Sequence, residues 1–227
     1  MDGICESPTK SDQGKYGMRL FALSFAAAVM LTQTAQATDP ESLNVHGIEL
    51  GMSLDDARGE LVERGYKKKI GNQPASFGDI VKNALDEISG PVPKGGLMQF
   101  ETRTEIMILL FVALPNGPEV NSITYRLNDP SISYADLSET AVDLYGKPDF
   151  ERTSLGLTPD NLPRLYWLAS PPDAAHGAPG GAFLELAYSK SSGESEFHSG
   201  QITLKDGGAR RDRQTKEIKD AVLKALQ

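Results

Sequence analysis

The spacing of apolar residues along the chain predicts four helices. In each of them apolar residues recur every three or four positions, as they do on one face of a helix. Three of the helices start with a serine that precedes an aspartate by three residues, and such a pair caps helix N-termini. The four predicted helices cover residues 53–65, 76–90, 133–146 and about 212–226.

Six other segments follow the alternation that predicts strands. The segment 105–114, EIMILLFVAL, is apolar on both phases, so it is expected to be central in the sheet and covered on both sides. Turns rather than crossover helices join the segments, which favours an antiparallel sheet. The KKK run at 67–69 is predicted to be a solvated loop between two helices. The predicted strands cover residues 97–104, 105–114, 119–127, 162–169, 181–189 and 199–205.

The order of elements repeats, with a helix followed by three strands in each half. The helix start at 53–56 matches the one at 133–136 at a shift of 80, and Ile-Thr at 123–124 matches Ile-Thr at 202–203 at a shift of 79. Two tandem units are one interpretation, and a single sheet with similar hairpins and helices is the other. Both predict an α+β fold with helices packed on an antiparallel sheet. The two units would cover residues 38–130 and 131–227, the second with the C-terminal helix.

The apolar phase of each segment also predicts which side chains form the core. In RLYWLA (164–169), Leu165 and Trp167 share one phase, while Arg164 and Tyr166 share the other. A tryptophan in a strand is more often buried than exposed, so Arg164 and Tyr166 are expected to face outwards. Elsewhere the residues predicted to be buried are Ile123, Tyr125, Leu137, Leu144, Leu184, Leu186, Ile202 and Leu204.

Residues 1–37 have the pattern of a secretory signal peptide. The apolar run at 20–31, LFALSFAAAVML, carries no charge, follows Arg19 and precedes the sequence Ala35-Gln36-Ala37. A basic start, a short apolar run and an A-x-A site are typical of a signal peptide, and the run is shorter than the roughly 20 residues that span a bilayer. Cleavage is expected after Ala37; a buried helix or an uncleaved anchor is the alternative.

The start of the chain has two interpretations. Residues 1–17 are polar and precede Met18, which is either the true start or part of a long n-region. In both cases the mature chain is expected to be a soluble periplasmic or secreted protein without a transmembrane span. The single cysteine, Cys5, lies in the part that would be removed, so the mature chain would form no disulfide.

The charge of the chain argues against nucleic acid as a partner. The formal net charge is −8, and the first 37 residues hold three basic and three acidic groups, so cleavage would leave the net charge unchanged. Nucleic-acid binding depends on a basic surface. The hydrophobic content of 39% is that of a globular domain.

Two short motifs carry a family resemblance. The segment 47–53, GIELGMS, runs into the first predicted helix, and YGKP at 145–148 closes the third. They resemble the helix start and the helix end of small secreted proteins with the beta-lactamase-inhibitor-protein-like fold, which outer-membrane assembly lipoproteins of the small-protein-A type share. The resemblance implies helices packed on an antiparallel sheet, sometimes in tandem, and a role in binding enzymes or other envelope proteins. Here the two motifs lie in different units, and the lipid-bearing cysteine of the lipoproteins is absent.

The sequence contains no recognisable catalytic or metal-binding motif. The histidines His46, His176 and His198 are far apart, without the clustered spacing of zinc ligands, so surface or loop positions are expected for them. No nucleophile elbow, phosphate loop or calcium loop is present. We therefore expect no metal, no other cofactor and no enzymatic activity, although a site assembled only in three dimensions would leave no motif.

The candidate binding residues are Arg164, Tyr166 and His176. His176 lies in SPPDAAHGAPGG (170–181), which is longer than an ordinary hairpin loop and is either a linker or a loop that contacts a partner. Tyrosine and arginine often anchor interfaces. The leading hypothesis is a protein that binds another envelope protein through its sheet face and loops. The alternative is a periplasmic small-ligand-binding protein or enzyme with a pocket at the helix–sheet junction.

Overall fold

The computed structural model describes residues 42–86, 96–153, 163–168, 181–191 and 197–227. All of them belong to one compact unit that extends from Ala35 to Gln227. The predicted signal peptide and His176 lie outside the described residues, so what the sequence indicates about them remains a prediction. Among the described helices, none combines the length and the apolar composition needed to cross a membrane.

An antiparallel sheet of eight strands forms the centre of the fold, and four helices pack on it, which confirms the predicted α+β class. The strands follow the order β3-β4-β5-β6-β10-β9-β8-β7 across the sheet. They are β3 (Lys67–Asn72), β4 (Leu97–Glu101), β5 (Glu105–Leu114), β6 (Gly117–Asn128), β7 (Phe150–Thr153), β8 (Pro163–Leu168), β9 (Phe183–Ser191) and β10 (Phe197–Lys205). The other described elements are the hairpin of β1 (Asn44–Val45) and β2 (Ile48–Glu49) and the helices α1 (Leu54–Glu63), α2 (Phe77–Leu85), α3 (Tyr134–Tyr145) and α4 (Ala209–Ala225).

Each half of the sheet consists of the strands that follow one helix. Strands β3 to β6 follow α1, with α2 inserted after β3, and strands β7 to β10 follow α3. The halves meet where β6 pairs with β10, and Thr124 lies opposite Thr203 within this pair. Each half therefore has four strands, one more than the apolar pattern predicted, and the additional strands β3 and β7 form the two edges.

The edge strand β3 corrects the prediction of a loop at the KKK run. Lys67, Lys68 and Lys69 open this strand, and all three stay exposed. A strand with one neighbour and little buried surface has no apolar alternation, so its sequence resembles that of a loop. Lysines at a sheet edge also hinder pairing with further chains, and β3 carries a bulge between Lys68 and Ile70.

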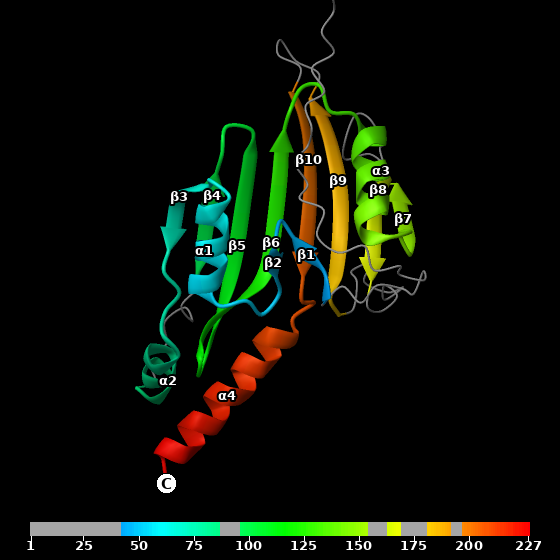
Figure 1. Ribbon diagram of the computed structural model, residues 1–227. Helices are drawn as coiled ribbons and strands as arrows, with labels where there is room; N and C mark the ends of the chain where they lie inside the picture. The colour runs from blue at the N-terminus through cyan, green and yellow to red at the C-terminus, as the bar shows by residue number, and fades with distance from the viewer. Residues whose placement is uncertain (1–41, 87–95, 154–162, 169–180, 192–196) are drawn as a thin grey trace, which may run out of the picture. The chain divides into compact units, whose positions relative to one another are not determined.

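One face of the sheet is covered by α1, the β1–β2 hairpin and α3, which lie on the viewer's side in Figure 1. The core fills the space between these elements and the sheet. Among the predicted core residues, Leu137 and Ile202 are partly buried against this core, and the following are fully buried: Ile123, Tyr125, Leu184, Leu186 and Leu204.

The prediction that Leu144 is buried is wrong, because this side chain is 48% exposed. In the last turn of α3, Tyr145 takes the buried position instead, and Ala141 is buried one turn earlier. The Tyr145 ring meets the ring of Trp167 at a centroid distance of 6.0 Å. Leu144 and Tyr145, three and four positions after Ala141, fit the same helical stripe almost equally well. The contact with Trp167 places Tyr145, and not Leu144, on the buried side.

The prediction that β5 is covered on both sides holds only for its end, where residues 111–114 are all buried, and is wrong for residues 105–110. The strand is third from the β3 edge. Its Met107 and Leu109 face the core, whereas Ile106, Ile108 and Leu110 are half-buried on the other face. The apolar residues on both phases of β5 therefore reflect a sheet whose second face also carries apolar side chains.

The C-terminal helix α4 is anchored at its start. Asp206 is buried, and its carboxylate accepts hydrogen bonds from the backbone N–H groups of Gly208 and Arg210, both at 2.9 Å. Arg210 and Arg213 lie 3.7 and 3.6 Å from the carboxylate of Glu119 on β6. No side chain of α4 is fully buried, so its attachment rests on these polar contacts and on its packing against β5 and α2.

Candidate functional site

The candidate functional surface is the face of the sheet opposite α1 and α3, which we call the open face. Side chains alternate along a strand, so the residues between the buried ones point to this face. Backbone pairing aligns them in rows across the sheet. The middle row runs through all eight strands: Ile70, Gln99, Ile108, Thr124, Thr203, Glu185, Tyr166 and Phe150.

Two flanking rows complete the open face. One row contains Lys67, Glu101, Ile106, Arg126, Gln201 and Ala187, and Arg164 and Arg152 continue it on β8 and β7. The other row contains Asn72, Leu97, Leu110, Ser122, Lys205 and Phe183. The open face thus combines residues from both halves of the chain.

Apolar side chains gather on the part of the open face formed by β3, β4 and β5. Ile70 is 56% exposed and Leu97 is 37% exposed. Next to them on β5, Ile106, Ile108 and Leu110 are half-buried. Single exposed apolar residues are ordinary, but a contiguous group of them is typical of an interaction surface.

The predicted binding residues Arg164 and Tyr166 lie at the other end of the open face, and Glu185 ties them together. Arg164 Nη1 donates to Glu185 Oε1 at 2.7 Å, and the Tyr166 hydroxyl donates to the same oxygen at 3.2 Å. Burial and the Glu185 carboxylate raise the pKa of Tyr166 above its ordinary value, so its hydroxyl remains a donor. On the opposite phase Leu165 and Trp167 are buried, as predicted. His176, the third predicted residue, lies outside the described part of the chain.

Sequence reasoning missed Glu185, which holds this cluster in place. Its only signal in the sequence is a polar position between Leu184 and Leu186. The pairing of β8 with β9 places Glu185 opposite Tyr166, and that register is not readable from the sequence. The shared acceptor orients both side chains, and Phe150 flanks Tyr166 with a centroid distance of 6.1 Å between their rings.

A second cluster of titratable groups lies on the covered side of the sheet, around His46. This residue adopts a left-handed backbone with φ of 53°, and its ring lies 4.1 Å from the Tyr125 ring. The Tyr66 hydroxyl donates to Glu105 Oε2 at 2.5 Å. Burial and Glu105 raise the pKa of both Tyr66 and Tyr125 far above the ordinary value. The cluster joins the β1–β2 hairpin to the sheet, and both phenols stay protonated.

The stability of the protein is expected to fall as the pH drops below 6.5, the ordinary pKa of histidine. Burial lowers the pKa of His46. The charge of Glu105 raises this pKa, and the charge of Arg64 lowers it further. The unfolded chain therefore binds a proton at a higher pH than the folded chain, so the stability from neutral His46 is complete above 6.5 and is lost as the pH falls through the lowered pKa. Urea unfolding between about pH 8 and 5 measures the decline.

The matched variant for this prediction is His46→Asn, because asparagine tolerates a left-handed backbone. Its free energy of unfolding is expected to decline less steeply with falling pH than that of the unchanged protein. Parallel declines in the two proteins would show that another group is responsible.

A hollow of about 320 Å³ lies between the start of α2 and the β5–β6 turn. Residues 73–78, 113–115, 117 and 118 line it, with none of their side chains titratable. The alternative prediction of a pocket with converging Asp, His or Arg side chains gains no support from this hollow. Within the described residues, no three His, Asp or Glu side chains gather as a metal site would need.

Comparison of the chain with protein-family models, with curated proteins and with solved structures found no match. The geometry of the open face is therefore the basis for a functional proposal.

Proposed function

We propose that this chain is an exported interaction protein that binds another protein of the cell envelope through the open face of its sheet. The observation that carries the proposal is the contiguous group of Ile70, Leu97, Ile106, Ile108 and Leu110 on that face. Burying such a group against a partner is favourable by roughly 25 cal/mol per Å² of apolar surface.

The size of the open face supports this role. Eight strands are separated by seven gaps of about 4.8 Å, so the face is roughly 34 Å wide. Strands β9 and β10 have nine residues each, which corresponds to about 30 Å of length. The projected area of about 1,000 Å² is of the order of the roughly 800 Å² that each partner contributes to a stable interface, and the buried positions Ser122, Thr203 and Phe183 lower the part of it that a partner can contact.

The Arg164–Glu185–Tyr166 cluster adds directional groups to this surface. Arg164 and Tyr166 are half-exposed, and their hydrogen bonds to Glu185 hold them before a partner binds. Less side-chain entropy is lost when preorganised groups enter an interface. Such arginine and tyrosine side chains are typical of residues that dominate binding energy.

Two further features support the proposal. The signal-peptide pattern of residues 1–37 favours export to the periplasm or beyond. Thr124 and Thr203, which match at a shift of 79 in the sequence, lie opposite each other where β6 meets β10. If the two halves are repeated units, a two-fold axis between β6 and β10 would relate them. The repeat would then join two four-stranded faces into one continuous binding face.

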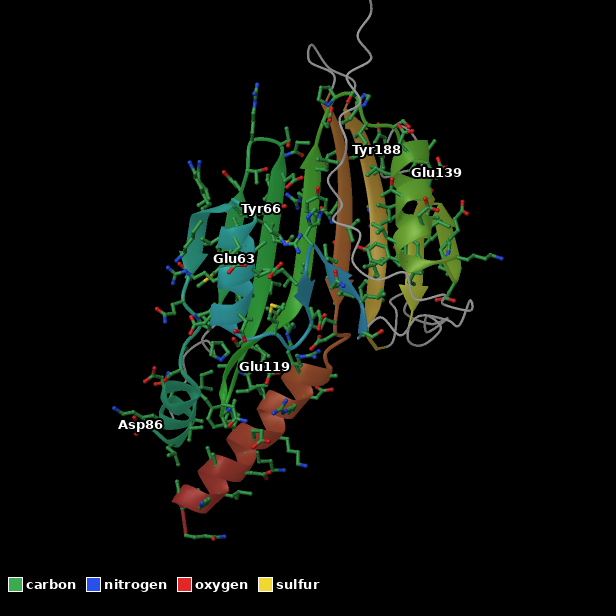
Figure 2. The ribbon with its side chains drawn as sticks, in the orientation of Figure 1. Glu63, Tyr66, Asp86, Glu119, Glu139 and Tyr188 are labelled. Atoms are coloured by element: carbon green, nitrogen blue, oxygen red, sulfur yellow. The ribbon has the colours of Figure 1, made fainter. Side chains whose placement is uncertain are left out.

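Site-specific photo-cross-linking in the producing cells tests the proposal. We expect p-benzoylphenylalanine in place of Ile108, in the middle row of the open face, to form an adduct with another envelope protein. The matched control carries the same group in place of Glu139, which is exposed on α3 (Figure 2), and is expected to give no such adduct. Mass spectrometry identifies the adduct. Equal yields at both positions, or an adduct at Glu139 alone, would exclude the open face as the contact surface.

A further inference from the structure

The charges of the described residues are segregated between the two sides of the sheet. Although the chain has a net charge of −8, the three rows of the open face carry five basic residues and two acidic ones. The basic residues are Lys67, Arg126, Arg152, Arg164 and Lys205, and the acidic residues are Glu101 and Glu185.

The helices on the covered side have the opposite charge. Helix α1 holds four acidic residues and one arginine, and α3 holds three acidic residues without a basic one. Glu63 and Glu139 mark these two helices in Figure 2. The molecule is therefore acidic on its helical side and basic on the open face, which orients it in the field of a charged partner.

Both carboxylates of the open face are already paired. Glu101 lies 3.5 Å from Lys69 Nζ, and Glu185 lies 2.7 Å from Arg164 Nη1. Just beyond the three rows, the Glu119 carboxylate is paired with Arg210 and Arg213 of α4. The three carboxylates are consequently paired with other cations, and none of them is paired with Arg126 or Lys205.

Arg126 and Lys205 are exposed on the open face, in its two flanking rows, on β6 and β10, the paired strands in the middle of the sheet. Within the described residues, neither has a carboxylate at ion-pair distance. Arg126 Nε donates to Gln201 Oε1 at 2.9 Å, and Lys205 Nζ lies 5.7 Å from the centroid of the Phe183 ring. These contacts orient the two cations without neutralising their charge.

The two cations flank the Thr124–Thr203 pair symmetrically. Arg126 follows Thr124 by two residues, and Lys205 follows Thr203 by two residues on the antiparallel neighbour. Lys205 lies opposite Ser122, four residues from Arg126 along β6. The rise along the strand and the step to the neighbouring strand together give a Cα separation of about 14 Å.

We propose that the partner surface bound by the open face is an acidic protein surface. It would place carboxylates about 14 Å apart against Arg126 and Lys205, with aliphatic side chains beside them against Ile108 and Leu110. This inference rests on the proposed function and specifies the chemistry of its partner. A protein fits better than a nucleic acid or an anionic membrane, because the face combines two unpaired cations with an aliphatic group and the helical side repels polyanions.

Binding of defined probes to the purified protein tests this inference. The probes are three fluorescent peptides of equal length, built from valine and serine with glutamate, glutamine or lysine at every third position, together with single-stranded DNA and phosphatidylglycerol vesicles. We expect the glutamate peptide to bind more tightly than every other probe. Its affinity is expected to fall several-fold between about 20 and 300 mM NaCl, because salt screens exposed charges.

The decisive variant is Arg126→Glu/Lys205→Glu, which is expected to weaken binding of the glutamate peptide at least tenfold. The matched control, Arg58→Glu/Lys219→Glu, changes the net charge equally on α1 and α4 and is expected to bind as the unchanged protein does. Thermal melts verify that both variants are folded. Equal losses in the two variants, preferential binding of DNA or vesicles, or no binding of the glutamate peptide would overturn the inference.

The cross-link at position 108 separates this inference from the proposed function. An adduct whose contacting surface on the partner is neutral or basic would overturn the inference and leave the proposed function in place. An adduct with an acidic protein surface, lost in Arg126→Glu/Lys205→Glu, would support both.

Discussion

Replacing Trp167 with alanine is expected to lower the free energy of unfolding by about 3–5 kcal/mol, the range for removal of a buried tryptophan. The side chain is 1% exposed. Its Nε1 donates a hydrogen bond to the carbonyl oxygen of Gly146 at 2.9 Å, and its ring packs edge-on against Tyr145. The substitution would leave a cavity between α3 and the sheet and a carbonyl without its donor.

Two controls separate the contributions at this position. Trp167→Phe keeps most of the ring and removes the donor, so a loss of about 1–3 kcal/mol is expected. Leu144→Ala, on the same helix as Tyr145 but half-exposed, is expected to change stability by roughly 0.5 kcal/mol or less. Urea unfolding measures all three variants. If Leu144→Ala cost as much as Trp167→Ala, the helix would be packed in the phase that the apolar pattern predicted.

Replacing Gly207 with alanine is expected to cost about 2–5 kcal/mol, from a left-handed backbone and from close packing together. Gly207 has φ of 64° and lies between β10 and α4. A Cβ atom there would lie 1.9 Å from the carbonyl oxygen of Gly181, just before β9. Because this neighbour is backbone, the segment itself would have to move.

Gly65→Ala is the matched control for Gly207→Ala. Gly65 also has a left-handed backbone, with φ of 85°, but a Cβ atom there would have no neighbour within 4 Å. Only the conformational cost of about 1–2 kcal/mol is therefore expected. Thermal and urea unfolding compare the variants. Equal losses at the two glycines would show that the approach of Gly207 to Gly181 contributes nothing to stability.

The starts of three helices were predictable because their determinants are local. The side chains of Ser53, Ser76 and Ser133 each accept a hydrogen bond from the backbone N–H group three residues later. At Ser133 the Asp136 carboxylate also accepts from the backbone N–H of Ser133, which completes a capping box. These contacts span three residues, so a short stretch of sequence contains all the information that they need.

The phase of β8 was predictable for a similar reason. Alternation along one strand separates Leu165 and Trp167 from Arg164 and Tyr166, and the largest apolar side chain marks the buried side. The partner of Arg164 and Tyr166 was not predictable. Glu185 reaches them through the register between β8 and β9, which depends on packing over the whole sheet.

The sequence by itself therefore determined the starts of α1, α2 and α3, the buried phase of most strands and the α+β class, since each follows from contacts between residues close in the chain. The tertiary structure decided the edge strands β3 and β7, the exposure of Leu144 and the half-buried second face of β5 at residues 106–110. It also decided that Arg126 and Lys205 lie on neighbouring strands. These features depend on which segments lie side by side, and burial against distant segments outweighs local preference when the two disagree.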